Sequence, residues 1–120
     1  MSTRSFIGLK NEDGSVDRVY CHHDSYRNLQ ILRENYNTLE KVKELLSYGN
    51  MSGLEKTIAD CEFYSRDCGE ELEEVKANHF KNVKDFLIKS TEDYTFLFED
   101  GKWKWRTWSN PLTAEDQNEK

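Results

Sequence analysis

Long apolar runs are missing from this chain of 120 residues. No stretch approaches the roughly 18 consecutive apolar residues that mark a membrane-spanning helix. The N-terminal residues also lack the apolar core of a secretory signal peptide. These absences predict a cytoplasmic protein that does not enter a membrane.

Cysteine is scarce as well. The three cysteines, Cys21, Cys61 and Cys68, are an odd number, which fits reduced thiols better than a framework of disulfides. Structural zinc sites usually contain close cysteine pairs such as C-x₂-C, whereas here Cys61 and Cys68 are seven positions apart. Cys21 lies directly beside His22, which makes a poor chelate. We therefore expect no metal and no other cofactor.

Basic side chains are outnumbered. Lys and Arg total 17 against 23 Asp and Glu, and the formal net charge is −6. A surface that binds duplex DNA needs clustered lysine and arginine to displace counterions, so we expect no direct binding to duplex DNA. The acidity suits a basic partner, including a protein whose groove normally holds nucleic acid; the alternative explanation is general solubility.

The acidic charge is concentrated in residues 55–76, which hold eight acidic residues against three basic ones, a local charge of −5. Acidic runs are typical of solvated faces or mobile loops. Solubility alone would be served equally well by dispersed charge, so the concentration favours a role in binding. The candidate binding residues are Asp67, Glu70, Glu71, Glu73 and Glu74.

Two Asp-Gly pairs predict two β-hairpins. Residues 4–10 and 15–21 alternate in hydrophobicity around Asp13-Gly14, and glycine accepts the positive φ that a tight turn demands. A second hairpin surrounds Asp100-Gly101. Its strands carry aromatic residues that pair across the hairpin: Tyr94, Phe96, Phe98, Trp103 and Trp105.

The middle of the chain has helical spacing. A ragged apolar stripe over residues 26–39 predicts a helix that Asp24 or Ser25 caps. Asn37 and Glu40 have the spacing of a capping box, which restarts the helix, and Gly49-Asn50 ends it. The apolar face of this second part is formed by Leu39, Val42, Leu45 and Leu46.

The remaining segments complete the predicted architecture. We expect a short loop over residues 51–54, a short strand over 61–64 and a helix over 82–89. The fold class is therefore α+β in the order β-β-α-α-β-α-β-β. An antiparallel sheet, built from an N-terminal and a C-terminal hairpin, packs against two to three helices. One domain spans residues 1–108, and the polar segment 109–120 is expected to be a disordered tail.

Residues 20–26 gather most of the chemically active side chains at a junction from strand to helix, where side chains and free backbone N–H groups point outward. A histidine beside a carboxylate can be held in one tautomer, an arginine can bind an anion, and a cysteine beside a histidine can act as a nucleophile. The candidate pocket residues are Cys21, His22, Asp24, Tyr26 and Arg66.

A structural interpretation of the same residues is also open. Asp24 would cap a helix, His22 would pack against the sheet, and Arg66 with Asp67 would fix a loop. No P-loop, H-E-x-x-H, G-x-S-x-G or paired-carboxylate signature is present. We therefore expect a binding protein rather than an enzyme.

Four short motifs follow one another along the chain: TRSFIG at 3–8, DGS at 13–15, YCHHDSY at 20–26 and YSRDCGE at 64–70. They are similar to the TRS-x-IG, DG, YCHWDGY and Y-x-RDRGE motifs of a family of small, mostly uncharacterised phage and prophage proteins. The resemblance extends to about residue 108 and implies a phage origin more than a chemistry. His23, Ser25 and Cys68 depart from it, since the family has Trp, Gly and Arg at these places.

The resemblance and the acidity together predict a phage-encoded accessory protein that acts in the cytoplasm of an infected bacterial cell. It would bind and inhibit a host or defence factor through an acidic surface, as an anti-CRISPR protein does, and a nucleic-acid-binding effector is an expected partner. The alternative is a small-ligand or nucleotide-binding (sponge) protein, or a hydrolase, with its pocket around residues 21–26 and Arg66. A concave pocket joining His22, Asp24 and Arg66 would favour the alternative, and a convex acidic face the inhibitor.

Overall fold

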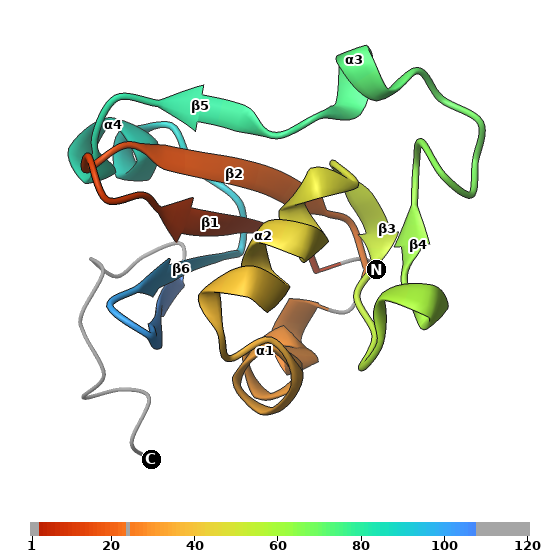
Figure 1. The fold of residues 1–120 in the computed structure, drawn as a ribbon, viewed down its shortest axis with the longest axis horizontal. Coiled ribbons are helices and arrows are strands. Elements are labelled where there is room, and N and C mark those ends of the chain that lie inside the picture. Colours follow the sequence, from red (N-terminus) through yellow and green to blue (C-terminus); the bar gives the residue numbers. More distant parts are fainter. Residues whose placement is uncertain (1–2, 24, 108–120) are drawn as a thin grey trace.

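The backbone forms one mixed β-sheet, with α1 and α2 lying across it in the view of Figure 1. The computed structural model describes residues 3–23 and 25–107. The strands are β1 (Ser5–Lys10), β2 (Val16–Cys21), β3 (Met51–Gly53), β4 (Glu62–Phe63), β5 (Asn78–Phe80), β6 (Tyr94–Glu99) and β7 (Lys102–Thr107). The helices are α1 (Asn28–Asn35), α2 (Leu39–Ser47), α3 (Leu72–Val75) and α4 (Val83–Ile88), with 3₁₀ turns at Ser25–Arg27 and Ile58–Asp60. The predicted α+β fold class is confirmed.

Both predicted hairpins are confirmed. β1 pairs antiparallel with β2, and β6 pairs antiparallel with β7. Gly14 has a φ of +91°, and in the second turn Asp100 and Gly101 have φ values of +56° and +78°. Positive φ at both central residues matches the right-handed twist of the flanking strands, which explains why aspartate and glycine occupy this turn.

The hairpins meet through a parallel pairing. β1 runs parallel to β6, with Ile7 opposite Phe96 and Leu9 opposite Phe98. β2 also pairs parallel with β3 at Cys21 and Met51. Parallel neighbours need a long crossover connection, and here the chain between the two hairpins supplies it. The sheet is therefore mixed, although each hairpin is antiparallel as expected.

Two apolar layers cover the two faces of the sheet. Because side chains alternate along a strand, Phe96 and Phe98 face α1 and α2, whereas Leu97 faces α4. On the α1–α2 side, Trp103 Nε1 donates a hydrogen bond of 2.8 Å to the carbonyl of Tyr36. The larger layer includes Ile7, Val19, Ile31, Leu32, Val42 and Leu45.

The first helix differs in detail from the prediction. α1 begins at Asn28 after the 3₁₀ turn that starts at Ser25, and no side chain caps it. Leu32 and Tyr36 are buried as the predicted stripe requires, whereas Tyr26 is exposed. Ile31, which the predicted stripe did not include, is buried as well. Asp24 lies outside the described residues.

The second helix is capped by Thr38 rather than Asn37. The Thr38 hydroxyl accepts a hydrogen bond of 3.3 Å from the Lys41 backbone N–H. Leu39 is the first helical residue and is 45% exposed, so it is not on the buried face. Gly49, with a φ of +84°, ends the helix as predicted.

The structure contains three short elements that the sequence did not predict. The expected loop at residues 51–54 contains β3, which pairs with β2 and β4. The acidic run contains the short helix α3, and β5 follows it on the edge of β2. The expected strand at 61–64 and helix at 82–89 are present as β4 and α4. The expected tail, 109–120, lies outside the described residues.

Gly8 has no space for a side chain. A Cβ at this position would lie 2.9 Å from Cζ and 3.0 Å from Cε1 of the buried Phe86 ring. We expect Gly8→Ala to destabilise the fold by about 1–3 kcal/mol, because the packed ring must shift. Urea denaturation measures this difference.

The matched control is Gly53→Ala, also in a strand, where a Cβ meets nothing within 4 Å. It should be neutral or slightly stabilising. Replacing Phe86 by Leu in the Gly8→Ala background should recover part of the loss. Equal stability of the two alanine variants would contradict the assigned packing of β1 against α4.

Candidate functional site

Cys21 is a core residue. It has no exposed surface, and its Sγ lies 3.4 Å from Nδ2 of the buried Asn28. Burial raises the pKa of the Cys21 thiol, although hydrogen bonds from Asn28 and Ser25 act in the opposite direction. A buried, protonated thiol has no access to a substrate, so the structure does not support a nucleophilic role for Cys21.

His22 pairs with a neighbouring tyrosine. Its Nδ1 lies 2.7 Å from the Tyr20 hydroxyl, and its ring lies edge-on to His23 with centroids 4.4 Å apart. Burial lowers the pKa of His22, and the charges of His23 and Arg4 lower it further. Burial also raises the pKa of Tyr20, so its hydroxyl keeps its proton and can donate to Nδ1. Tyr26, by contrast, is 66% exposed.

Arg66 fixes a loop. Its Nε and Nη2 each donate to the Asp67 carboxylate at 2.9 Å. Nη1 donates to the carbonyl of Ile58 at 3.0 Å, and Nη2 also donates to that of Cys61 at 2.8 Å. The guanidinium carbon lies 4.9 Å from the centroid of the Phe63 ring. With its donors used in this way, Arg66 fits the structural interpretation better than that of an anion-binding residue.

Asp67, one of the candidate binding residues, belongs to the same structural unit. Its Oδ2 accepts a hydrogen bond of 2.8 Å from the Phe63 backbone N–H. The bond from Arg66 and then the bond from Phe63 hold the pKa of Asp67 below its ordinary value. Asp67 therefore anchors the start of the acidic segment, and the exposed glutamates follow it.

The candidate pocket residues do not line either of the two best-formed cavities of the described part of the chain. These cavities measure about 880 Å³ and about 290 Å³, and neither is lined by Cys21, His22, Tyr26 or Arg66. Asp24 lies outside the described residues. At this junction, the end of β2 is packed into the core through Cys21, and Tyr20 and His22 form a hydrogen-bonded pair beside it.

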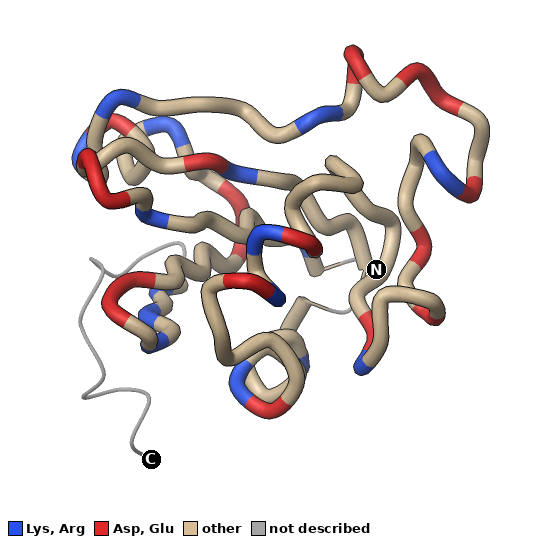
Figure 2. The backbone as a smooth tube through the Cα atoms, viewed as in Figure 1, with Lys and Arg blue, Asp and Glu red and all other residues tan. Residues whose placement is uncertain are grey.

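The acidic segment is exposed and is anchored at both ends. Every residue from 67 to 74 is exposed. The Glu70 backbone N–H donates to the Tyr64 carbonyl at 3.0 Å, and the Asn50 N–H donates to the carbonyl of buried Val75 at 2.7 Å. Figure 1 shows α3 standing away from the sheet, and Figure 2 shows acidic positions along this projecting stretch. The segment forms a convex acidic surface.

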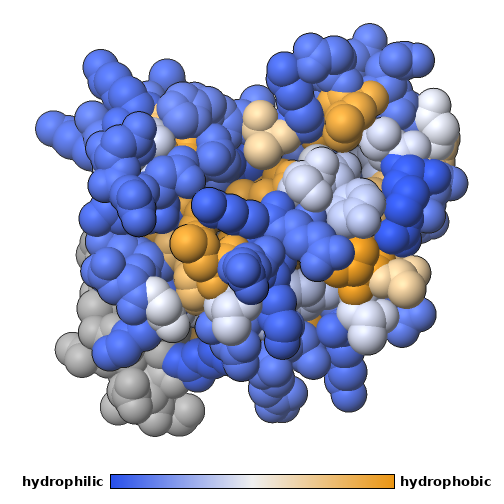
Figure 3. Space-filling model, in the orientation of Figure 1, coloured by the Kyte–Doolittle hydropathy of each residue, from blue (hydrophilic) through white to orange (hydrophobic). Residues whose placement is uncertain are grey.

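An apolar side chain sits among these carboxylates. Leu72 is 46% exposed. Glu73 forms an ion pair of 2.8 Å with Lys76, whereas the side chains of Glu70, Glu71 and Glu74 have no hydrogen bond or ion pair within the described part of the chain. Figure 3 shows a small apolar area bordered by hydrophilic side chains in the region of α3.

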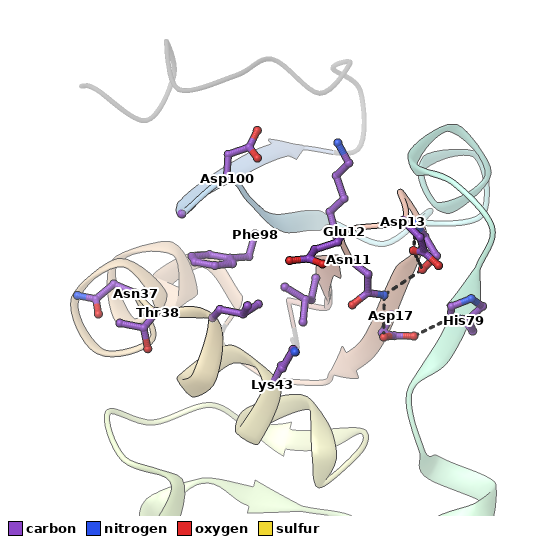
Figure 4. A pocket seen from close by; sticks show the side chains of 15 residues that line it. Asn11, Glu12, Asp13, Asp17, Asn37, Thr38, Lys43, His79, Phe98 and Asp100 are labelled. Carbon is purple, nitrogen blue, oxygen red and sulfur yellow. Dashed lines mark hydrogen bonds and ion pairs between the residues drawn. The ribbon is translucent and has the colours of Figure 1, made fainter.

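The larger cavity was not found by sequence reasoning. It opens between the turns of the two hairpins, the start of α2 and β5 (Figure 4). Leu9 and Phe98, opposite each other in β1 and β6, line it from the sheet. Each Asp-Gly pair predicts its own turn, but no local pattern indicates that the two turns lie side by side. Only the parallel pairing of β1 with β6 brings them together.

Hydrogen bonds fix one wall of this cavity (Figure 4). Asn11 Nδ2 donates to Ser15 Oγ and to Asp17 Oδ2, each at 3.1 Å. Ser15 Oγ donates to Asp13 Oδ1 at 2.6 Å, and Asp17 Oδ1 lies 2.8 Å from His79 Nδ1. The hydroxyl and backbone bonds from Ser15 lower the pKa of Asp13. Asp13 and Asp17 are therefore already occupied as acceptors.

Comparison with models of known protein families, with curated proteins and with solved structures gives no match. Within residues 3–23 and 25–107, no group of three or more His, Cys, Asp or Glu side chains is arranged to hold a metal ion. No helix in the same ranges is long and apolar enough to cross a membrane. Fold and surface define the chain as a small α+β domain with a projecting acidic segment.

The three cysteines should differ in reactivity. Cys68 is exposed, whereas Cys21 and Cys61 are buried. Desolvation and the nearby carboxylates of Glu62, Glu70 and Asp67 raise the pKa of Cys68, so alkylation by iodoacetamide should accelerate above about pH 8.5. Mass spectrometry should find one modified thiol per native chain and three after denaturation. Native labelling of Cys21 would contradict its burial.

Asp67 should stabilise the fold in a pH-dependent way. Because its pKa is lower in the folded chain than the ordinary value of about 3.9, its contribution is present above that value. It is lost as the pH falls through the folded pKa. The difference in unfolding free energy between the wild type and Asp67→Asn should therefore be full at neutral pH and shrink below about pH 4.

Urea denaturation from neutral pH to about pH 2.5 measures this difference. Glu74→Gln, which removes an exposed carboxyl group without a hydrogen-bonded partner among the described residues, is the matched control and should show little dependence on pH. A wild-type advantage over Asp67→Asn that stays constant across the range would show that the Arg66–Asp67 pair is not a source of stability.

Proposed function

We propose that this chain is a phage-encoded accessory protein that binds and inhibits a bacterial host or defence factor through its acidic segment. The phage origin rests on the resemblance of its sequence motifs, and the inhibitory role rests on that resemblance together with the acidity of the chain. The observation that carries the binding role is the form of residues 67–74, which are exposed throughout and attached to the domain at both ends.

The partner that fits this surface has a groove lined by lysine and arginine, such as the nucleic-acid channel of a defence effector. Glu70, Glu71 and Glu74 offer carboxylates without a hydrogen-bonded partner among the described residues. Complementary charge speeds the encounter of two proteins and suppresses wrong partners. Leu72 supplies an apolar contact that can be buried at the centre of the carboxylates.

Anchoring of the segment favours binding. Arg66 and Asp67 hold its start through the five hydrogen bonds described above and through the contact of the Arg66 guanidinium with the Phe63 ring, while Val75 is buried at its end. A surface ordered before binding loses less conformational entropy when the complex forms. This arrangement supports recognition by a preformed convex surface.

The alternative, a small-ligand site around residues 21–26 and Arg66, has little support from the positions of these residues. Cys21 is buried, Arg66 is bound to its own loop, and neither cavity includes them. A hydrolase or a nucleotide sponge centred on residues 21–26 is therefore the weaker proposal.

Changing Glu70, Glu71, Glu73 and Glu74 together to Gln should weaken binding to the partner. A tagged chain captures the partner from a bacterial lysate, and biolayer interferometry then compares the variants. We expect a slower association rate and a flatter dependence on salt, because electrostatic steering is lost. The melting temperature should change by less than about 2 °C, since exposed charges contribute little to stability.

A matched pair of double variants separates position from net charge. Glu71→Gln with Glu74→Gln changes the acidic segment, whereas Glu34→Gln with Glu44→Gln makes the same charge change on α1 and α2. The first pair should slow association and the second should not. If the quadruple variant keeps wild-type affinity and salt dependence, the electrostatic inhibitor proposal fails.

A further inference from the structure

The two hairpin turns form one side of the larger cavity because of the sheet topology. β1 and β6 are parallel neighbours, so the turns that follow them leave from the same end of the sheet. Leu9 and Phe98 are the last pair in this ladder and lie at the base of the cavity. The cavity measures about 880 Å³, which is within the usual range of ligand pockets.

The cavity has an excess of negative charge. Its lining includes four carboxylates, those of Glu12, Asp13, Asp17 and Asp100, against the two lysines Lys10 and Lys43. Lys10 is paired with Glu99 at 2.8 Å, outside the lining. His79 is bound to Asp17. The surroundings of the cavity thus favour a positively charged group.

Two of the carboxylates are available to a ligand. Asp13 is used by Ser15, and Asp17 is used by Asn11 and His79. By contrast, Glu12 and Asp100 have no hydrogen bond or ion pair among the described residues, and they lie on the two different turns. Figure 4 places both at the hairpin side of the cavity, with Lys43 at the opposite end on α2. Glu12 and Asp100 are therefore the two lining carboxylates that have no partner among the described residues.

Apolar and amide groups complete the site. Leu39 lines the cavity and is 45% exposed, so an aliphatic chain can cover it. Asn37 lies beside it at the junction of α1 and α2, and its side-chain amide has no hydrogen bond among the described residues. A side-chain amide both donates and accepts, which suits it to the main chain of a peptide.

We infer that this cavity binds a basic peptide segment of a partner protein. The guanidinium of an arginine lies between Glu12 and Asp100, its alkyl stem covers Leu39, and Asn37 bonds the peptide backbone. Arginine fits both features of the site. Its guanidinium is a cation that two carboxylates can hold, and its alkyl stem can pack on the exposed leucine. This site does not include the acidic segment and is independent of the function proposed for it.

Fluorescence polarisation with a labelled, end-blocked peptide of sequence Gly-Leu-Arg-Leu-Gly tests the inference. Glu12→Gln combined with Asp100→Asn should weaken binding at least about tenfold, because the arginine loses both carboxylates. Asparagine is chosen at position 100 because it tolerates the positive φ of this turn. Replacing the arginine of the peptide by citrulline, which has nearly the same shape without the charge, should have the same effect on the wild-type protein.

The control Glu71→Gln with Glu74→Gln removes the same charge from α3 and should bind the peptide within about twofold of wild type. Leu39→Ser should weaken binding by a smaller factor than the loss of the carboxylates. Amide chemical-shift changes on titration should centre on Asn37, Leu39 and Asp100. Circular dichroism confirms that each variant is folded.

Equal affinity of the wild type and the Glu12→Gln, Asp100→Asn variant overturns the inference. Tighter binding of spermine than of the peptide also overturns it, since the site would then belong to a free polyamine. If the α3 control weakens peptide binding instead, the acidic segment is the peptide site and the cavity is not. If the variants of Glu71 and Glu74 lose binding to the captured partner but still bind the peptide, only the function proposed for the acidic segment fails.

Discussion

Main-chain pairing between β1 and β6 joins two hairpins that are otherwise distant parts of the chain. Ile7 and Leu9 on β1 lie opposite Phe96 and Phe98 on β6, and these side chains form the centre of the layer that α1 and α2 cover. The intervening Leu97 contributes to the layer beneath α4. One ladder therefore connects both apolar layers. Its parallel direction also places the two hairpin turns at one end of the sheet, where the larger cavity opens.

A second constraint holds the acidic segment. Like-charged side chains repel one another, and such a run gains little from burial, so an acidic stretch would ordinarily be a mobile loop. Here Arg66 fixes one end by donating hydrogen bonds to three acceptors in its own loop. These acceptors are the Asp67 carboxylate and the carbonyls of Ile58 and Cys61. At the other end the Val75 carbonyl accepts from Asn50 and lies close to Gly49, where a Cβ would be only 2.5 Å from it. Between these anchors Glu70, Glu71 and Glu74 have no ion pair among the described residues, whereas Glu73 pairs with Lys76.

The two surfaces proposed for binding have different physical characters. The acidic segment is convex and offers carboxylates around one leucine, which suits a broad basic groove. The cavity between the hairpin turns is concave and is lined by four carboxylates against two lysines, which suits a single basic side chain. Both surfaces would bind cationic partners, consistent with the net charge of −6. The chemically active residues around Cys21, in contrast, serve packing and local hydrogen bonding.

The sequence by itself determined the features that depend on neighbouring residues. Asp13-Gly14 and Asp100-Gly101 specify tight turns because few other residue pairs adopt their φ angles, Gly49 ends α2 for the same reason, and the glutamates at 70–74 stay exposed because burying charge is costly. The tertiary structure alone decided which strands pair. Backbone N–H and C=O groups are the same in every residue, so nothing local marks β1 and β6 as parallel partners or Met51 as the partner of Cys21. The burial of Cys21 and the cavity that joins the two turns follow from those long-range pairings.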